Sequence, residues 1–290
     1  MATLRGHAIS TLWGLADHTY VTCAAGYAWP CWGRSAGGSI ICAGTGSSAK
    51  ANCISWPKST AGLVYGVTGV CHQTANRILW PAGVTVHRAK GYWASVLAYG
   101  VYGTDTVAWL ARLAACSGTS GEIPECVPRA AGAAKRGLKA GEGEAVKLPG
   151  DAKDRALVRR IGALYQKDIT PQEHKRRLTL KSAVDFKTLA GETKLVMQSN
   201  LGTMVRAAQI KDVQAIQMEL FSMKDDLGQR LHAGSIGGEE LAVKVNAAVN
   251  KALKSCLKSL GKEAYSKMFE LEPGEEMNVV DPKIAVQVHQ

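Results

Sequence analysis

The side chain best placed for chemistry is Cys71, which follows a turn-forming run at residues 65–69 and opens the segment CHQTANRIL at residues 71–79. That segment has the apolar spacing of a short amphipathic helix. A helix N-terminus carries unpaired backbone N–H groups and the positive end of the macrodipole, so it lowers the pKa of a thiol and can hydrogen-bond an oxyanion. Cys71 is therefore a candidate nucleophile, although the same position also suits a small buried side chain.

A thiol becomes a catalyst only when a base lies near it in space. His18 is the best-placed histidine, because it opens the alternating segment HTYVTC and so stands at the end of a predicted strand. His72 follows Cys71 directly and would point about a hundred degrees away from it around a helix. His87 lies on a second alternating segment and is the reserve base. We expect Cys71 to be the nucleophile and His18 the general base.

The order of these features, a strand histidine, a β segment and a cysteine at a helix start, resembles the circularly permuted papain-like cysteine enzymes. That superfamily includes NlpC-type peptidases and the lecithin retinol acyltransferase-like group, and the resemblance covers about residues 10–110. The chain has Val70-Cys71 where the acyltransferase group has Asn-Cys, and Val-Cys-His where NlpC enzymes have Asp-Cys-Ser. The resemblance implies a small antiparallel sheet, a helix headed by the nucleophile, and acyl transfer through a thioester.

The resemblance also implies a third polar residue that orients the imidazole. Ser39, on the next predicted strand, is the nearest candidate, and Asn52 or Gln73 could do the same work. The oxyanion would be held by the Cys71 backbone N–H and a second donor, either the Tyr65 hydroxyl or a side-chain amide. The substrate would be a peptide or an amide, and the side chains expected to bind it are Tyr65, Gln73, Trp32 and Tyr99.

Cysteine spacing and hydropathy bear on cofactors and location. The eight cysteines form no CxxC pair and no regular zinc spacing, so we expect no metal and no cofactor. No run of 18 apolar residues occurs, which predicts that the chain has no membrane span. The N-terminus does not look like a signal peptide, so we expect the cytoplasm and free thiols, or else export by another route. With export, Cys116 and Cys126 could close the loop between them as a disulfide.

The two halves of the chain differ in composition. All seven tryptophans precede residue 110, and short β-rich segments alternate there with Gly, Ser and Pro, namely HTYVTC, GSIICAG and GLVYGV. Two segments of this half have helical patterns, CHQTANRIL and GTDTVAWLARLAACS. From Asp151 the pattern is helical, with helices expected over residues 151–167, 191–208, 211–232 and 238–262, and a capping box at residues 170–173.

These patterns predict an α+β fold, with a papain-like α+β domain at residues 1–126, a linker at 127–150 and an all-α helical domain at 151–290. The predicted function is a cysteine-dependent acyl-transfer enzyme, either an amidase or peptidase or an amide acyltransferase. The net charge of +11 favours acidic partners and carries an alternative. In that alternative the chain is a non-enzymatic basic module whose helices bind a protein or nucleic acid, and its cysteines are structural.

Overall fold

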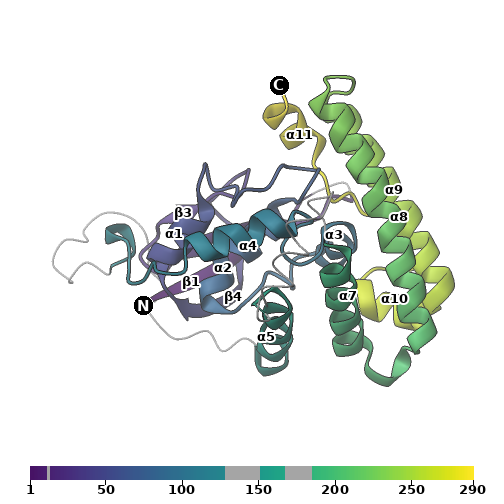
Figure 1. The fold of residues 1–290 in the computed structure, drawn as a ribbon, viewed down its shortest axis with the longest axis horizontal. Helices are drawn as coiled ribbons and strands as arrows, with labels where there is room; N and C mark the ends of the chain where they lie inside the picture. The colour runs from purple at the N-terminus through teal and green to yellow at the C-terminus, as the bar shows by residue number, and fades with distance from the viewer. Residues whose placement is uncertain (12–13, 128–150, 167–184) are drawn as a thin grey trace.

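The computed structural model describes residues 1–11, 14–127, 151–166 and 185–290. The fold is α+β, as the sequence predicted: a small antiparallel sheet with short helices forms the first half, and long helices form the second (Figure 1). The sheet has the order β3-β2-β1-β4, with strands β1 (Ala2–Ile9), β2 (His18–Cys23), β3 (Ala28–Trp29) and β4 (Ser39–Gly46).

The register of the sheet places His18 at one end of it. Strand β1 lies in the middle and pairs antiparallel with β2 and β4, and Ile9, its last residue, stands opposite His18. Every second side chain of β1, beginning with Ala2 and Leu4, is turned inward, as expected for a strand with one buried face. Strand β2 has the bounds that the alternating pattern predicted. The imidazole therefore stands at a sheet end, next to the loops that leave it.

Four helices accompany the sheet: α1 (Ser48–Ser55), α2 (Cys71–Leu79), α3 (Tyr92–Tyr99) and α4 (Thr106–Ala115). Two short 3-10 segments follow α2 and α4, at Trp80–Ala82 and Pro124–Cys126. Helix α2 coincides with the predicted segment and packs against β2 and β1. The predicted β segment at residues 62–67 is wrong: the backbone turns there, with Gly66 in the left-handed region and its N–H bonded to Gly69.

The second half contains α5 (Asp151–Gln166), α7 (Phe186–Leu201), α8 (Ala207–His232), α9 (Gly238–Leu260), α10 (Lys262–Phe269) and α11 (Pro282–Val288), with a 3-10 turn at Gly202–Met204. Helices α8 and α9 pack on each other along their length, as the break at residues 234–238 predicted. The predicted capping box at residues 170–173 lies outside the described residues. Among the helices that are described, none combines the length and the apolar composition needed to cross a membrane.

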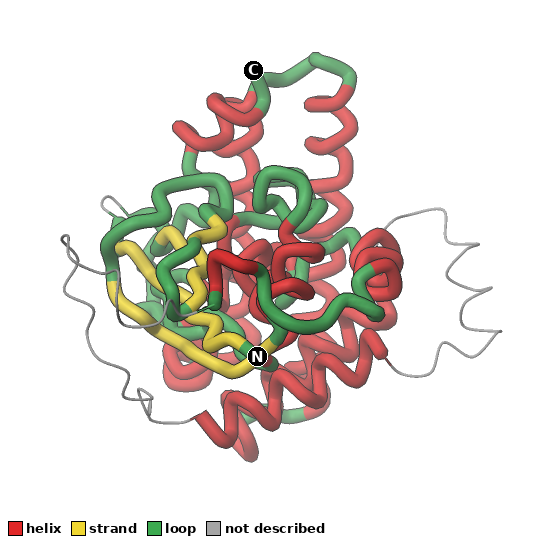
Figure 2. The backbone as a smooth tube through the Cα atoms, turned by 90° about the vertical axis from the view of Figure 1, so that its left-hand side faces the viewer, coloured by secondary structure: helices red, strands yellow, loops and turns green. Residues whose placement is uncertain are grey.

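The two halves share one hydrophobic core because helices of the second half pack on α3. Figure 2 shows the strands gathered on one side of the molecule, with helices beside and behind them. The Gln217 side chain of α8 donates to the last carbonyls of α3, and the Glu192 carboxylate of α7 accepts the N–H of Val101, at 2.6 Å. Residues 128–150 of the expected linker lie outside the described residues. Residues 281–288 near the C-terminus also lie beside the sheet end where His18 stands.

Two disulfides, Cys23–Cys126 and Cys53–Cys116, correct the expectation of free thiols throughout. The pairing between Cys116 and Cys126 that the sequence left open is not formed, because each of them reaches a cysteine much nearer the N-terminus. The disulfides fasten the end of α4 and the segment after it to α1 and to the end of β2. The four cysteines outside the disulfides are all buried, namely Cys31, Cys42, Cys71 and Cys256.

Candidate active site

Helix α2 begins at Cys71 because the chain before it is extended and its first amide groups are satisfied locally. Val70, the N-cap, has extended backbone angles, and its N–H donates to the Gln73 side-chain carbonyl at 3.2 Å. The Gln73 amide in turn donates to the Gly100 carbonyl at 3.0 Å, which anchors the turn to the end of α3. Cys71 is only 7% exposed. Its thiol is thus fixed at a helix N-terminus, as the sequence predicted, and almost shielded from water.

The hydrogen bond made by His18 determines which of its ring nitrogens can act as a base. Nε2 lies 2.9 Å from the backbone carbonyl of Arg34. Because a carbonyl can only accept, Nε2 carries the proton of the neutral imidazole and Nδ1 keeps its lone pair. Nδ1 is buried, and no group other than the Cys71 side chain offers it a hydrogen bond in the described parts of the chain. The imidazole is therefore held in the tautomer that leaves a buried acceptor available.

Cys71 and His18 shift each other's pKa toward the ionised pair. Burial alone would raise the pKa of the Cys71 thiol, but its hydrogen bond with His18 and the charge of the imidazolium outweigh burial, and the pKa is lowered. Burial would likewise lower the pKa of His18, but the hydrogen bond and charge of Cys71 outweigh it, and the pKa is raised. Both pKa shifts are in the direction of a thiolate beside an imidazolium, which is the activated form of a nucleophilic cysteine.

Thr19 is a functional candidate that sequence reasoning missed. It is fully buried, and its hydroxyl has no hydrogen-bond partner within the described residues. Its backbone N–H and its hydroxyl both interact with the sulfur of Cys71 and help to lower the pKa of the thiol. The neutral thiol points instead at the Asp17 carbonyl, 3.8 Å away. A threonine inside a strand gives no sequence signal, because that residue type is ordinary there.

A tight loop at residues 30–34 holds the imidazole from the other side. Cys31 and Trp32 both have backbone angles in the left-handed region, with φ of 51° and 68°, which is uncommon for residues with a side chain. The turn brings Gly33 against the ring: a Cβ at Gly33 would lie 2.5 Å from Cε1 of His18. The next residue, Arg34, supplies the carbonyl bonded to Nε2. The loop therefore fixes the position of His18 by contact and by hydrogen bond.

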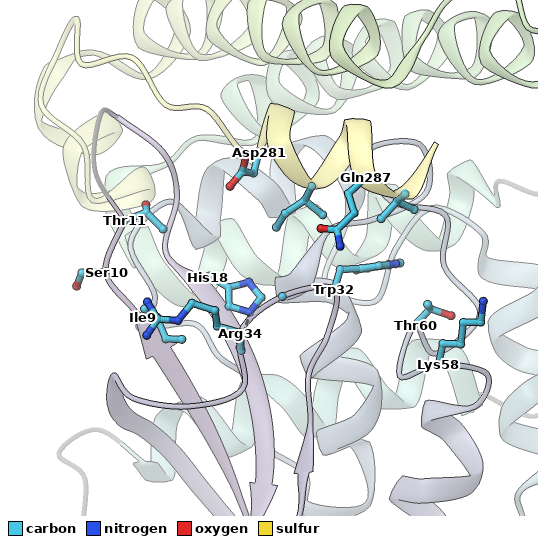
Figure 3. A pocket seen from close by; sticks show the side chains of 13 residues that line it. Ile9, Ser10, Thr11, His18, Trp32, Arg34, Lys58, Thr60, Asp281 and Gln287 are labelled. Atoms are coloured by element: carbon cyan, nitrogen blue, oxygen red, sulfur yellow. Dashed lines mark hydrogen bonds between the residues drawn. The ribbon is translucent and has the colours of Figure 1, made fainter. Parts of the chain in front are cut away.

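A cleft of about 890 Å³ opens beside His18 (Figure 3). Its floor is the end of β1, the loop with Trp32 and Arg34, and the turn with Lys58 and Thr60. Its other wall comes from the C-terminal residues, and the side chains lining that wall are Asp281, Ile284, Gln287 and Val288. Figure 3 shows Asp281 above His18 and Gln287 above Trp32. The volume is in the upper part of the range of ligand-binding clefts.

Tyr65 connects this C-terminal wall to the approach of α2. Its hydroxyl accepts the backbone N–H of Asp281 at 3.0 Å, and its backbone carbonyl lies 2.8 Å from Nε2 of His289. The Tyr65 ring is buried, and it meets the ring of Trp32 edge to face with 5.2 Å between centroids. Residues 281–289 were not predicted to belong to the site, because a contact across such a sequence distance has no local pattern.

The other residues predicted for the triad lie elsewhere or do other work. Ser39 is exposed, and from its position on β4 it pairs with Ala8 of β1. The partner of the His18 ring is instead the Arg34 carbonyl. Asn52 accepts the indole N–H of Trp29, at 3.2 Å. The orienting group in this structure is therefore a backbone carbonyl, which no residue-type pattern can indicate.

Three further candidates are part of the packing. Gln73 is fully buried and supports the start of α2, as described above. Tyr99 is fully buried as well, and its hydroxyl donates to the Gly66 carbonyl at 2.8 Å. His87, the reserve base, lies 3.0 Å from the carboxylate of Asp154 on α5. Of the four side chains expected to bind substrate, Trp32 lines the cleft and Tyr65 adjoins it.

The described residues contain no group of three or more His, Cys, Asp or Glu side chains arranged to hold a metal ion. Comparisons with protein-family models, with curated proteins and with solved structures found no match. The resemblance to permuted papain-like enzymes therefore stays a prediction.

Proposed function

We propose that this chain is a cysteine-dependent acyl-transfer enzyme in which Cys71 is the nucleophile and His18 the general base. The observation that carries the proposal is the surroundings of one sulfur atom. Two buried polar groups without other described partners, Nδ1 of His18 and the Thr19 hydroxyl, interact with Cys71 at a helix N-terminus. Buried polar groups without partners are rare, and both groups become hydrogen-bond donors to sulfur once the proton has moved from the thiol to the imidazole.

In the acylation step, the Cys71 thiolate attacks the carbonyl carbon of an amide bound beside His18, which lines the cleft, and the C–S bond forms as the carbonyl oxygen takes up the negative charge. The Cys71 backbone N–H at the start of α2 donates to that oxygen. Tyr65 is a second donor, because its hydroxyl accepts from Asp281 and so keeps its own proton for another partner. The imidazolium then gives the Nδ1 proton to the leaving nitrogen, the C–N bond breaks, and a thioester remains on Cys71.

In the deacylation step, the neutral His18 takes a proton from water, or from an acceptor amine, as that group attacks the thioester carbonyl. The same two donors hold the second oxyanion. When it collapses, the C–S bond breaks, the acyl product leaves, and the sulfur departs as thiolate beside the imidazolium. Hydrolysis and transfer to an amine thus use the same residues and differ only in the acceptor.

Thiol reactivity tests the proposal directly. Native protein treated with limiting iodoacetamide at pH 7 should be alkylated at Cys71 before the other free thiols, because burial raises the pKa of Cys31 and raises that of Cys256 to about 12. The variant His18→Ala should slow alkylation of Cys71 specifically. With an activated ester as acyl donor, mass spectrometry should find the acyl group on Cys71 in the native protein and not in Cys71→Ala.

The opposite result would favour the alternative function predicted from the sequence, a non-enzymatic binding module. If Cys71 reacts no faster than Cys256, and no acyl group is trapped on it, the thiol is structural and the chain is a basic binding module. Circular dichroism of each variant serves as the control for folding. Cys71→Ala is expected to fold, since removing one sulfur atom at the edge of the core leaves only a small cavity.

A further inference from the structure

We infer that the cleft binds an extended polypeptide segment in which acidic side chains flank an apolar one. This inference deepens the proposed function, since it names the substrate class of the same site. It starts from two cations. Arg34 and Lys58 both line the cleft, both are exposed, and neither forms an ion pair with any part of the chain that the structure describes. Figure 3 shows them at opposite ends of the floor, with His18 and Trp32 between them.

The middle of the cleft is apolar. Trp32 lies in the floor. Ile284 and Val288 also line the cleft, and both belong to α11 on the opposite wall. An aromatic ring faced by aliphatic side chains suits an apolar side chain of the ligand, because both surfaces leave water when it binds. Charges at both ends with an apolar centre require a ligand that reaches along the whole cleft, as a run of several residues does.

The charge around the cleft also favours an acidic ligand. Among the described residues that line it, Asp281 is the single acidic side chain, and it stands above His18, away from Lys58. The chain as a whole carries a net charge of +11, so an anionic segment is attracted from a distance as well as at contact. Acidic side chains on both sides of the apolar residue would meet Arg34 at one end and Lys58 at the other.

Binding to the inactive variant Cys71→Ala tests this inference without turnover. Three rhodamine-labelled peptides, alike except that a central leucine is flanked by glutamates, glutamines or lysines, are titrated and followed by fluorescence anisotropy. We expect the affinity to be highest for the glutamate peptide, lower for the glutamine peptide and lowest for the lysine peptide. The ratio of glutamate to glutamine affinity should fall by about fivefold for each of Arg34→Gln and Lys58→Gln, the upper range for exposed ion pairs. Higher salt should reduce the same ratio.

Lys283→Gln is the matched control, since Lys283 is exposed on the same wall, outside the lining of the cleft, and the change in net charge is identical. The ratio of glutamate to glutamine affinity in this control should equal that of Cys71→Ala alone. Equal affinity for the three peptides, or a ratio that falls as much in Lys283→Gln, would overturn the inference. Iodoacetamide labelling distinguishes this failure from failure of the proposed function. If Cys71 is reactive but the peptides bind without a charge preference, the inferred substrate class is wrong and the proposed function stands. If Cys71 is inert but the peptides bind with a charge preference, the proposed enzyme activity is wrong and the binding preference stands.

Discussion

At the scale of single residues, the candidate site consists of the groups that face one sulfur atom. His18 and Thr19 are neighbours on β2, and both interact with Cys71. The first two residues of one strand therefore supply the base and a further donor. The sequence identified Cys71 and His18 from their positions at the start of a helix and at the end of a strand. It could not identify Thr19 or the Arg34 carbonyl, because their roles depend on contacts between segments and not on residue type.

The variant Thr19→Val should make Cys71 less reactive while the fold persists. Valine has nearly the shape of threonine and lacks the hydroxyl that stabilises the thiolate, so the pKa of Cys71 should rise. A hydrogen bond to a charged group contributes about 1.5 kcal/mol or more, which corresponds to alkylation about tenfold slower at pH 7. Thr19→Ser keeps the hydroxyl and is the matched control. Equal alkylation rates in the valine and serine variants would exclude the hydroxyl from the site.

At the scale of elements, the loop at residues 30–34 positions the base, and Gly33 is the residue that makes this possible. In Gly33→Ala the new Cβ would lie 2.5 Å from Cε1 and 2.7 Å from Nε2 of His18, so the ring must shift away from the Arg34 carbonyl. We expect Cys71 in this variant to be alkylated as slowly as in His18→Ala, with unchanged circular dichroism. Gly118→Ala, where a Cβ meets nothing within 4 Å, is the control. Native reactivity in Gly33→Ala would mean that the loop does not position His18.

The helices and strands also show which parts of the fold can be predicted from sequence patterns. The bounds of α2 and β2 were predicted because their apolar spacing is strong and local. Strand β1 was missed although its side chains alternate inward and outward, since Gly6 and Ala8 at inward positions are too small to give a strong hydrophobic alternation. Helix α3 was missed because it is buried on all sides, and a helix with apolar residues all round has no helical periodicity to detect. The left-handed residues at 31 and 32 could not be predicted, because neither is a glycine.

At the scale of the whole molecule, two features determine how the site is assembled. The helical half encloses α3 and returns residues 281–289 to the sheet end, so the cleft has walls from both ends of the sequence. The two disulfides hold the segments that surround the sheet. Disulfides persist in oxidising compartments, and the location of the chain, in the cytoplasm or exported, stays a prediction.

Glu192 provides a test of how the halves are joined. This fully buried carboxylate accepts the N–H of Val101 and the hydroxyl of Tyr165 at 2.9 Å, and burial raises its pKa from 4.5 to about 7 despite those bonds. Below pH 4.5 the folded and unfolded chains are both protonated at this residue. Between pH 4.5 and 7 only the unfolded chain loses the proton, so this group lowers stability progressively as pH rises, by on the order of 3 kcal/mol.

Glu192→Gln does not titrate and keeps an acceptor for Val101. Its free energy of unfolding, relative to the native chain, should therefore increase between pH 4.5 and 8, as measured by urea denaturation at several pH values. Other titrating groups are common to both proteins and cancel in the difference. A difference that is constant with pH would show that Glu192 is not held neutral in the shared core.

Cys71 and His18 are proposed to form an ionised pair, and the pH dependence of Cys71 alkylation measures the ionisation of that thiol. The rate constant with iodoacetamide, followed by mass spectrometry from pH 5 to 10 in the native chain and in His18→Ala, reports the thiolate fraction of that cysteine. We predict that the native rate persists well below the pH at which an ordinary thiol, with a pKa of 9.0, loses its reactivity. We also predict that His18→Ala shifts the profile to higher pH. Coincident profiles in the two proteins, both with the inflection of an ordinary or buried thiol, would contradict the account.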